Sequence, residues 1–361
     1  MSSRSWFSKL LLPWYHENHR ALPWRETKDP YRIWLSEVML QQTRVDQGLG
    51  YYLRFTQRWP TVEKLAAAHE NEVLKEWQGL GYYSRARNLL KAAQHVVVKH
   101  GGKFPDEHAD LLKLKGVGEY TAAAIASICF HRPTAVVDGN VYRVLARVFG
   151  IEIPIDSTAG RKQFKELAMK LLDAKHPGDH NQAVMELGAT VCTPKSPDCM
   201  RCPLQAKCAA FATGTISLLP VKQSKTKTRD RFFNYLHIPA GKDIYMQQRT
   251  SKDIWTGLYE LPLIESGKPM TKRALETALG KAFGPDWCIV GQYEAARHVL
   301  SHQVIHAVFW SVVPPKNFMP PKEWERVPLM KLDKLAVPRL IERWIASALP
   351  SLSSQTQPPK L

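Results

Sequence analysis

The chain has 361 residues, enough for two or three domains, and 44% of them are hydrophobic, so each domain can bury a core. Its 50 Lys and Arg residues outnumber 33 Asp and Glu residues, and the formal charge of +17 favours a polyanionic partner such as DNA, RNA or an anionic membrane surface. No apolar run is long enough to span a membrane, and the N-terminal one is too short for a signal peptide, so we expect a cytoplasmic protein.

Helical periodicity dominates the first 213 residues. A short amphipathic helix is predicted over residues 5–20, and a Pro-containing loop leads from it to a second helix over residues 30–42. Asp29 and Pro30 predict the start of that second helix, as N-cap and first helical residue. We see no strand alternation and no internal repeat in this part, and therefore expect a mainly α-helical region that ends near residue 214.

The helix predicted over residues 30–42 carries a carboxylate on an apolar face. Glu37 lies in its middle, and the residues one helical turn before and after it are apolar. Burial at such a position favours the protonated carboxyl, the form that a general acid needs. The alternative is a structural glutamate paired with Arg25 or Arg32.

A Gly-x-Gly turn at residues 116–118 joins two helical patterns. Glycine permits positive φ and a close backbone approach, and the free N–H groups at the start of the next helix favour a phosphate. The string Leu-x-Gly-Val-Gly-x-x-Thr-Ala from Leu114 is typical of a helix-hairpin-helix element, which holds the DNA backbone without reading bases. The candidate phosphate contacts are Gly116, Val117, Gly118 and Thr121.

Asp138 follows an apolar stretch and precedes a helix predicted over residues 141–149. Its simplest role is to cap that helix, and the functional alternative is that its charge faces a pocket that also holds Glu37. Glycosidic cleavage needs two carboxyl groups in unlike environments. One protonates the leaving group and the other stabilises the positive sugar. The separation of the two residues in sequence does not decide whether they meet.

Four of the six cysteines form a C-x6-C-x2-C-x5-C pattern within 17 residues. A cytoplasmic chain of this size is not expected to carry a disulfide framework. Four thiolates so close together therefore predict a metal centre, either a tetrahedral zinc ion or a [4Fe–4S] cluster, and spacing alone leaves both open. The predicted ligands are Cys192, Cys199, Cys202 and Cys208.

A change in composition separates the helical region from the rest of the chain. Residues 215–231 are basic, polar and nearly free of apolar residues, which predicts an interdomain linker. Beyond it the apolar pattern has a period of two, which indicates strands. Residues 232–238 and 244–246 flank a turn and predict a hairpin. The remaining expected segments are a strand at 302–310, helices at 271–283 and 337–347, and a disordered polar tail at 351–361.

Taken together, the motifs resemble those of a known family. The hairpin, the Asp138 loop and the four-cysteine loop, in this order and spacing, resemble the endonuclease III-like helix-hairpin-helix DNA glycosylases. Within that superfamily, five segments are similar to the adenine DNA glycosylases, the MutY family: LPWR (22–25), WLSEVMLQQT (34–43), GLGYYSRARN (79–88), DGNVYRVLAR (138–147) and NQAVMELGA (181–189). The resemblance extends over about residues 5–350 and is most specific in the first 210.

The resemblance implies a multidomain fold. A helical catalytic region would occupy residues 1–214, with a six-helix barrel at about 25–133 and an iron–sulfur helical domain built from the N-terminal helix and about 134–214. The four cysteines would hold a [4Fe–4S] cluster rather than zinc. After the linker, residues 232–350 resemble the family's α/β Nudix-like domain that recognises 8-oxoguanine, and the segment IWTGLYELP (254–262) carries that likeness.

The resemblance also implies an activity. The protein would be a monomeric, bacterial-type repair enzyme at the nucleoid that flips out and removes adenine mispaired with 8-oxoguanine or G in double-stranded DNA. Glu37 would protonate the adenine ring and later activate water, and Asp138 would stabilise the oxocarbenium-like sugar. The supporting residues would be Asn140 and Tyr120 in catalysis, Arg25, Leu40, Gln182 and Glu186 in the adenine pocket, and Gln42 and Tyr82 as wedges in the duplex.

The chain departs from its relatives at two places that bear on function. Tyr120 stands where the bifunctional relatives carry a Lys that forms a Schiff base with the sugar, so we expect a monofunctional enzyme with little strand cleavage. Leu300, Ser301 and His302 stand where the family usually has Phe-Ser-His. Ser301 and His302 still offer hydrogen bonds to 8-oxoguanine, whereas Leu300 removes an aromatic wedge.

Two other functions stay open from the sequence. One is a bifunctional, endonuclease III-like pyrimidine glycosylase, and the other is a non-catalytic DNA-binding scaffold with structural zinc. The metal-binding run of the Nudix hydrolases is missing from the C-terminal region, so we expect that region to recognise its ligand without hydrolysing it.

Overall fold

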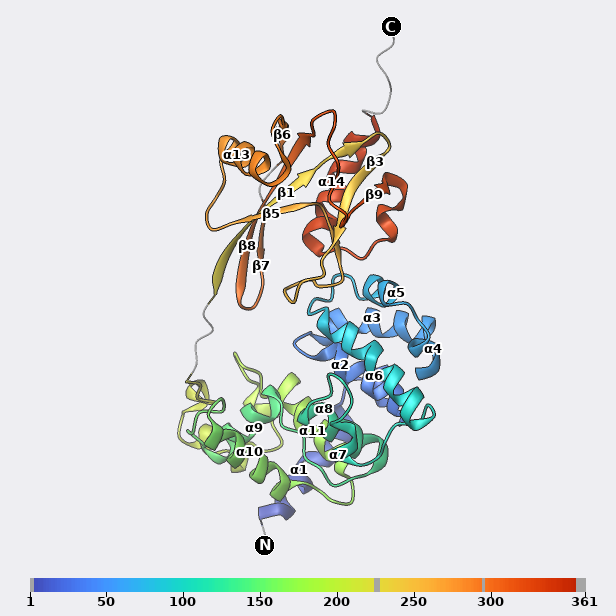
Figure 1. Cartoon of the computed structure of the whole chain (residues 1–361). Helices are drawn as coiled ribbons and strands as arrows, with labels where there is room; N and C mark the ends of the chain where they lie inside the picture. Colours follow the sequence, from blue (N-terminus) through green and yellow to red (C-terminus); the bar gives the residue numbers. More distant parts are fainter. Residues whose placement is uncertain (1–2, 224–227, 294–295, 355–361) are drawn as a thin grey trace. The chain divides into compact units, whose positions relative to one another are not determined.

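The computed structural model describes residues 3–223, 228–293 and 296–354, and these fall into two compact units (Figure 1). The first unit comprises the described parts of Met1–Ala67 and Asn88–Lys225 and is helical. The second comprises Ala68–Arg87 and the described part of Thr226–Leu361, and it contains every strand that the structure describes. The helical segment 68–87 therefore groups with the strands, although its composition resembles the rest of the helical region.

The helices of the first unit agree closely with the sequence pattern. Helix α1 spans Ser3–Asn18 and helix α2 spans Pro30–Leu40. The Asp29 carboxylate accepts a hydrogen bond from the N–H of Tyr31, which confirms the predicted cap. The other helices are α3 (Val45–Arg58), α4 (Val62–Ala66), α6 (Ser84–His100, shared with the second unit), α7 (His108–Leu111), α8 (Glu119–Phe130), α9 (Gly139–Phe149), α10 (Thr158–Leu171), α11 (Pro177–Thr190) and α12 (Ala209–Ala212).

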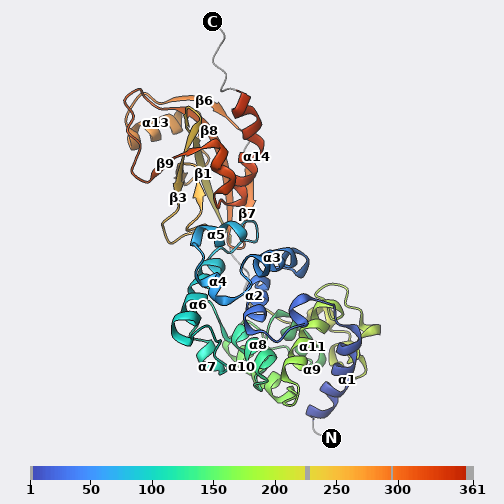
Figure 2. The same cartoon turned by 90° about the vertical axis from the view of Figure 1, so that its right-hand side faces the viewer.

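Helix α11 lies between α1, α8 and α9, and α8 packs in turn against α2 (Figures 1 and 2). Two glycines permit these close approaches. A Cβ at Gly178 would lie 2.9 Å from the Cα of Ile128 on α8, and one at Gly188 would lie 2.6 Å from the Cβ of Asn140 on α9. Larger residues there would force the helices apart. The start of α11 therefore lies against the end of α8, and its last turn lies against the start of α9.

The second unit is built on two sheets. In the first, the strand order is β5 (Leu263–Ser266), β1 (Arg229–His237), β8 (Gln303–Val313) and β6 (Cys288–Gln292), with β7 (Ala296–Val299) also paired to β8. Strands β1 and β8 are parallel and the other pairs are antiparallel. The second sheet contains β2 (Pro239–Ala240), β3 (Asp243–Gln248), β4 (Tyr259–Glu260) and β9 (Trp324–Pro328).

Helices cover both faces of the first sheet (Figure 2). Helix α13 (Lys272–Phe283) places Leu275 and Leu279 in a core with Trp310 of β8. Helix α14 (Arg339–Ser354) covers the other face, where Trp344 stacks on Phe309 at 5.4 Å between ring centroids. Short elements complete the unit: α5 (Glu70–Glu76) and a 3-10 helix at Leu329–Lys334.

Three expectations about the C-terminal region are wrong in detail. The predicted hairpin forms but is short: Pro239–Ala240 pairs with Asp243–Ile244, and the N–H of Tyr245 donates to the carbonyl of Ile238 at 3.3 Å. It does not extend along residues 232–237, because β1 lies between β5 and β8 while β3 belongs to the other sheet. Strand β1 is buried on both faces from Phe233 to His237, as a central strand with two neighbours requires, and the chain changes sheets directly after it.

The other two expectations concern the residue at which the strand-containing region begins and the residue at which its tail begins. Strand β1 begins at Arg229, inside the predicted linker 215–231, and Arg231 is buried because acidic side chains surround it. Helix α14 runs to Ser354, so the first residues of the predicted tail are helical. Residues 224–227 of the linker and 355–361 of the tail lie outside the described residues.

Within the described residues, no helix combines the length and the apolar character that crossing a membrane requires.

Candidate active site and metal centre

Glu37 lies in the second half of α2, and its side chain is buried, with 8% of the residue exposed. Burial raises the pKa of Glu37 to about 7, and the charge of Asp138 acts in the same direction. A hydrogen bond from the Tyr120 hydroxyl and the charge of Arg25 oppose the rise. Near neutral pH, Glu37 therefore holds its proton in a large fraction of molecules, as a general acid requires.

The structural alternative for Glu37 does not hold, because both candidate arginines pair with other carboxylates. Arg25 Nη2 lies 2.5 Å from Glu186 Oε2, and Arg32 Nε lies 3.7 Å from Asp29 Oδ2. Burial without an ion pair to either arginine leaves desolvation as the dominant influence on Glu37.

Tyr120 lies in the first turn of α8, where its hydroxyl has two neighbours. It hydrogen-bonds the Glu37 carboxyl, and it lies 3.2 Å from the sulfur of Met185 on α11. The single hydroxyl proton can be donated to an ionised Glu37, or to Met185 when Glu37 carries its own proton. Burial and the charges of Glu37 and Asp138 raise the pKa of Tyr120 well above its ordinary value, so the phenol stays neutral.

Asp138 is the N-cap of α9, as its position in the sequence predicts. Its Oδ1 accepts from the N–H groups of Asn140 and Val141 at 2.9 and 2.8 Å, and its Oδ2 accepts from the Asn140 amide at 2.8 Å. Burial raises the pKa of Asp138, and these hydrogen bonds oppose the rise. The cap and the functional alternative are compatible, because the Asp138 charge also acts on Glu37 and Tyr120.

Arg143 on α9 connects this carboxylate loop with the cysteine loop. Its guanidinium donates to Asn140 Oδ1 at 2.7 Å and to the carbonyls of Gly188 and Cys192 at 2.5 and 2.6 Å. Asn140 in turn holds Asp138. The backbone carbonyl of Cys192 is thus linked to Asp138 through two hydrogen-bonded side chains, those of Arg143 and Asn140.

Glu186 on α11 is 1% exposed and accepts hydrogen bonds from two arginines. Arg20 Nη2 lies 2.7 Å and Arg25 Nη2 lies 2.5 Å from Glu186 Oε2. Burial favours the neutral acid, but the two arginines outweigh it and lower the pKa of Glu186 to about 2. Gln182 lies one turn earlier on the same helix and is also buried.

Sequence reasoning missed two residues of this region, Arg20 and Met185. A buried glutamate such as Glu186 needs compensating charge, but no local pattern indicates that Arg20 supplies it from the loop after α1. Met185 had a usable signal, since it is three residues after Gln182 on one helix and so lies near the same face.

The candidate wedge residues lie in strained turns. Leu40 is the last residue of α2, and Gln42, two residues later, has a φ of 55° and an exposed side chain. Tyr82, in the second unit, has a φ of 48° and is 41% exposed. A positive φ in a residue with a side chain costs on the order of 1–3 kcal/mol, so the surrounding structure must impose both turns.

The hairpin has the backbone that the Gly-x-Gly pattern predicts. Gly116 has a φ of 81°, and Gly118 is the N-cap of α8. The side chain of Thr121 is 1% exposed and its hydroxyl accepts from the Gln41 amide at 3.2 Å, so the phosphate contact predicted at this position would come from its backbone N–H. Val117 is 7% exposed and packs inward as well.

Leu300, Ser301 and His302 form the turn between β7 and β8 in the second unit. Leu300 is half-buried, whereas Ser301 and His302 are exposed. The N–H of Leu300 donates to the carbonyl of Gln303 at 2.8 Å, which closes the turn.

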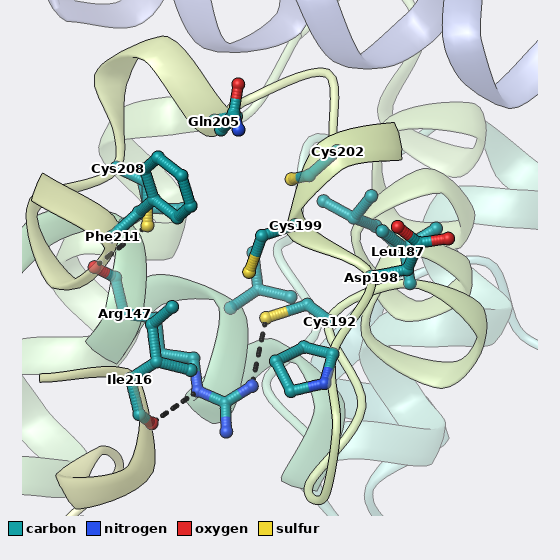
Figure 3. Close-up of a pocket in the computed structure, with 14 residues that line it drawn as sticks. Arg147, Leu187, Cys192, Asp198, Cys199, Cys202, Gln205, Cys208, Phe211 and Ile216 are labelled. Atoms are coloured by element: carbon teal, nitrogen blue, oxygen red, sulfur yellow. Dashed lines mark hydrogen bonds between the residues drawn. The ribbon is translucent and has the colours of Figure 1, made fainter. Parts of the chain in front are cut away.

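The four cysteines of the C-x6-C-x2-C-x5-C loop surround one cavity (Figure 3). Arg147 of α9 donates to Cys192 Sγ at 3.4 Å and to the carbonyl of Thr193 at 2.8 Å. Burial raises the pKa of Cys202 to about 11. In the parts of the chain that the structure describes, no three His, Cys, Asp or Glu side chains converge as a single ion would require. Four thiols around a cavity, with a guanidinium beside one of them, are a donor set that fits a thiolate-bound cluster.

Comparison with known proteins gives two domain matches. A model described as "HhH-GPD superfamily base excision DNA repair protein" matches residues 35–172, and a NUDIX domain model matches residues 234–347. Among solved structures, a thermostable thymine-DNA glycosylase superposes with a TM-score of 0.54 and 30% identity over 58% of this chain and 97% of its own. An endonuclease III–DNA complex, at 23% identity and a TM-score of 0.50, shows the same fold. These matches confirm the predicted fold class.

Three relatives of similar sequence are named adenine DNA glycosylase. An adenine DNA glycosylase of Buchnera aphidicola (Schizaphis graminum) is 35% identical over 257 residues, 71% of this chain and 74% of its own. The adenine DNA glycosylases of Arabidopsis thaliana and Homo sapiens are both 38% identical, over 76% and 77% of this chain. The matched region covers 50% and 61% of those longer proteins. The chain belongs to the adenine DNA glycosylase family, with a helix-hairpin-helix glycosylase region followed by a Nudix-like domain.

Proposed function

We propose that this protein is a DNA glycosylase that hydrolyses the N-glycosidic bond of adenine mispaired with 8-oxoguanine or with G. The observation that carries the proposal is the site of Glu37 and Asp138, two carboxyl groups whose surroundings differ. Glu37 is buried and protonated near neutral pH, whereas Asp138 is held by two backbone N–H groups and an amide. Acid-assisted loss of a base needs this division of roles.

Glu37 delivers its proton to a ring nitrogen of adenine, which makes the base a better leaving group. The sugar becomes positively charged as the bond breaks, and the Asp138 carboxylate stabilises it electrostatically. Asn140 keeps the carboxylate in place through its amide. Glu37, ionised after the first step, then accepts a proton from the attacking water, with Tyr120 donating to it.

Tyr120 also supports a monofunctional reaction. A phenol cannot form the imine that the bifunctional relatives use to cleave the strand, and the raised pKa of Tyr120 keeps it neutral and weakly nucleophilic. We therefore assign the product as an abasic site in an intact strand.

The adenine pocket is assigned to Gln182, Leu40 and the Arg25–Glu186 pair. The amide of a glutamine offers one donor and one acceptor, which match the amino group and a neighbouring ring nitrogen of adenine. The ion pair of Arg25 with Glu186 holds the part of α11 that carries Gln182, because Gln182 lies one helical turn before Glu186. The duplex would be held by the backbone of the hairpin at Gly116–Gly118, with Gln42 and Tyr82 as wedges. Ser301 and His302 would read 8-oxoguanine.

We assign a [4Fe–4S] cluster to Cys192, Cys199, Cys202 and Cys208. The four thiols line one cavity with the Arg147 guanidinium beside Cys192, a donor set that fits a thiolate-bound cluster, and the family resemblance favours iron–sulfur over zinc. The cluster, when bound, supplies four metal–thiolate bonds that tie the loop together. Arg147 and Arg143 hold the loop to α9.

The test is an excision assay on four duplexes, followed by identification of the released base and of strand nicks. They contain A opposite 8-oxoguanine, A opposite G, thymine glycol opposite A, and T opposite G. We expect free adenine from the first, slower release from the second, and intact strands in both. Efficient excision of thymine glycol with nicking would establish the bifunctional alternative, and release of thymine from T:G would assign the activity for which the thermostable relative is named.

A second outcome separates the enzyme from a DNA-binding scaffold. Wild-type protein that binds the A:8-oxoguanine duplex as a monomer but releases no base would identify a scaffold. Iron and sulfide analysis of the same sample distinguishes the cluster from zinc.

A further inference from the structure

A network of ion pairs around two buried arginines, Arg231 and Arg249, lies beneath the β7–β8 turn in the second unit. Arg231 of β1 donates to both carboxylate oxygens of Glu265, at 2.6 Å each, and to both of Asp253, at 2.9 and 2.7 Å. Arg249 donates to Asp253 at 2.9 Å and to Glu260 at 2.8 and 3.0 Å. Both guanidinium groups also lie over the ring of Phe233.

Such a network is a poor way to stabilise a fold. The two arginines are 7% and 9% exposed and Glu260 is 1% exposed, so several charges have lost most of their hydration. Well-packed apolar side chains of similar volume are often at least as stable as a buried ion pair. A network of this kind is better explained by the geometry that it imposes on its surroundings.

The network reaches the turn through Gln303. Arg231 Nη1 donates to Gln303 Oε1 at 2.9 Å, and the carbonyl of Gln303 closes the turn by accepting from Leu300. The strand that carries Arg231 also holds the turn, because the N–H of Arg229 donates to the carbonyl of His302 at 3.1 Å. The turn that exposes Ser301 and His302 is thus hydrogen-bonded to β1 through the Gln303 side chain and the His302 carbonyl.

Asp253, whose carboxylate accepts from Arg231, belongs to the facing loop, which connects β3 with β4, and its backbone groups help to fold that loop. The N–H of Asp253 donates to Ser251 O at 2.9 Å, and the Thr256 hydroxyl donates to Asp253 O at 2.7 Å. Between them Trp255 adopts a φ of 60° and packs edge-on against His298 of β7, at 5.8 Å between ring centroids. Loop and turn line one cleft, to which residues 253–255 and 299–303 contribute.

We propose that Arg231, acting through Asp253 and Gln303, is a positioning residue that sets the preference for 8-oxoguanine over guanine. The inference rests on the proposed function, in which Ser301 and His302 read the lesion. The two bases differ at one edge, where guanine has an N7 acceptor and 8-oxoguanine has an N–H donor and a neighbouring oxygen. Discrimination at that edge depends on where a few hydrogen-bonding atoms lie, and an exposed turn needs a rigid support to hold them.

The test breaks the link at Gln303 and leaves the ion pairs in place. Gln303→Met keeps the length of the side chain but removes the acceptor for Arg231. Gln247→Met is the matched control, because Gln247 Nε2 donates to Glu260 Oε1 at 3.2 Å at the end of the network away from the turn. Gln303→Glu is the conservative variant, because its carboxylate still accepts from Arg231. The readout is the Kd for duplexes with 8-oxoguanine or G opposite a non-cleavable adenosine analogue, together with the thermal midpoint.

We expect Gln303→Met to weaken binding of the 8-oxoguanine duplex about tenfold, within the effect of one lost hydrogen bond to a charged group, and that of the G duplex less than twofold. Gln247→Met and Gln303→Glu should keep the wild-type ratio of the two constants. Equal weakening for both duplexes, or an unchanged ratio in Gln303→Met, would overturn the inference while leaving the proposed function intact. A wild-type protein with no preference between the duplexes would overturn the reading role of the turn, and the inference with it.

Discussion

Two buried glutamates in the first unit have nearly the same exposure and opposite chemistry. Glu186 is 1% exposed and lies between Arg20 and Arg25, and its pKa falls to about 2. Glu37 is 8% exposed, takes a hydrogen bond from neutral Tyr120 and lies in the field of Asp138, and its pKa rises to about 7. Burial acts in the same direction on both residues. The neighbours decide whether a buried carboxyl is a permanent charge or a proton donor near neutral pH.

The comparison extends to the second unit, where Glu260 is 1% exposed and accepts from Arg249, Tyr235 and Gln247. Its single guanidinium opposes the effect of burial but does not outweigh it, and the pKa of Glu260 is raised. Glu186 has two arginines and its pKa is lowered, whereas Glu37, left to a phenol and a second carboxylate, keeps a reactive proton. Four predictions test this contrast.

The largest effect is expected for Glu37→Gln. The amide cannot donate a carboxylic proton or activate water, so the single-turnover rate of adenine release should fall by about 10²–10⁴-fold or more, the range of general acid–base catalysis. Binding to the A:8-oxoguanine duplex should persist. Asp138→Asn, which keeps the cap hydrogen bonds of α9, is the companion variant and should also lose rate. Release at the wild-type rate by Glu37→Gln would remove Glu37 from the chemistry.

Glu186→Gln should instead act on folding. The change leaves Arg20 and Arg25 without their shared carboxylate, and breaking a buried pair in this way costs about 3–5 kcal/mol, with the lower end expected because Arg20 is 39% exposed. Urea unfolding measures the loss. The pKa of Glu186 lies below that of an unfolded glutamate, so its contribution is complete above pH 4.5 and is lost as the pH falls toward 2. The stability difference between wild type and variant should vanish over that interval.

The opposite sign is expected for the stability of Glu37→Gln. The folded pKa of about 7 lies above the unfolded value of 4.5, so ionisation of Glu37 costs stability as the pH rises from 4.5 to 7. Because a tenfold change in the acid dissociation constant corresponds to about 1.4 kcal/mol, the penalty reaches about 3 kcal/mol above pH 7. The variant should be more stable than wild type at pH 8 and similar at pH 4. Equal stabilities at both values would show that Glu37 is not held in a desolvated state.

The smallest effect is expected for Tyr120→Phe. It removes a hydrogen bond that favours the ionised form of Glu37, so the pKa of Glu37 should rise further. In the pH profile of single-turnover adenine release, the alkaline limb of wild type lies near pH 7 and should move to higher pH in the variant. Met185→Leu is the matched control, because it removes the other neighbour of the hydroxyl and leaves Glu37 in place. A limb at the wild-type position in Tyr120→Phe would mean that Tyr120 does not contact the reactive carboxyl.

Local sequence patterns were sufficient to predict several helices, caps and turns of this molecule. Helix α2, its Asp29 cap, the Gly-x-Gly turn and the Asp138 cap follow from residue preferences that act over one or two helical turns. The same patterns were insufficient for β1, which is paired with β5 and β8 from distant parts of the chain rather than with its nearest neighbour in sequence.

The sequence by itself determined where helix α2 begins, which carboxyl lies on an apolar face, and which four cysteines belong together. Only the tertiary structure decided that Arg25 neutralises Glu186 rather than Glu37, and that Arg231 is buried among carboxylates rather than exposed in a linker. The physical reason is the range of the interactions. Backbone preference and amphipathicity act between neighbours in the chain, whereas an ion pair such as Arg25–Glu186 joins residues 161 positions apart.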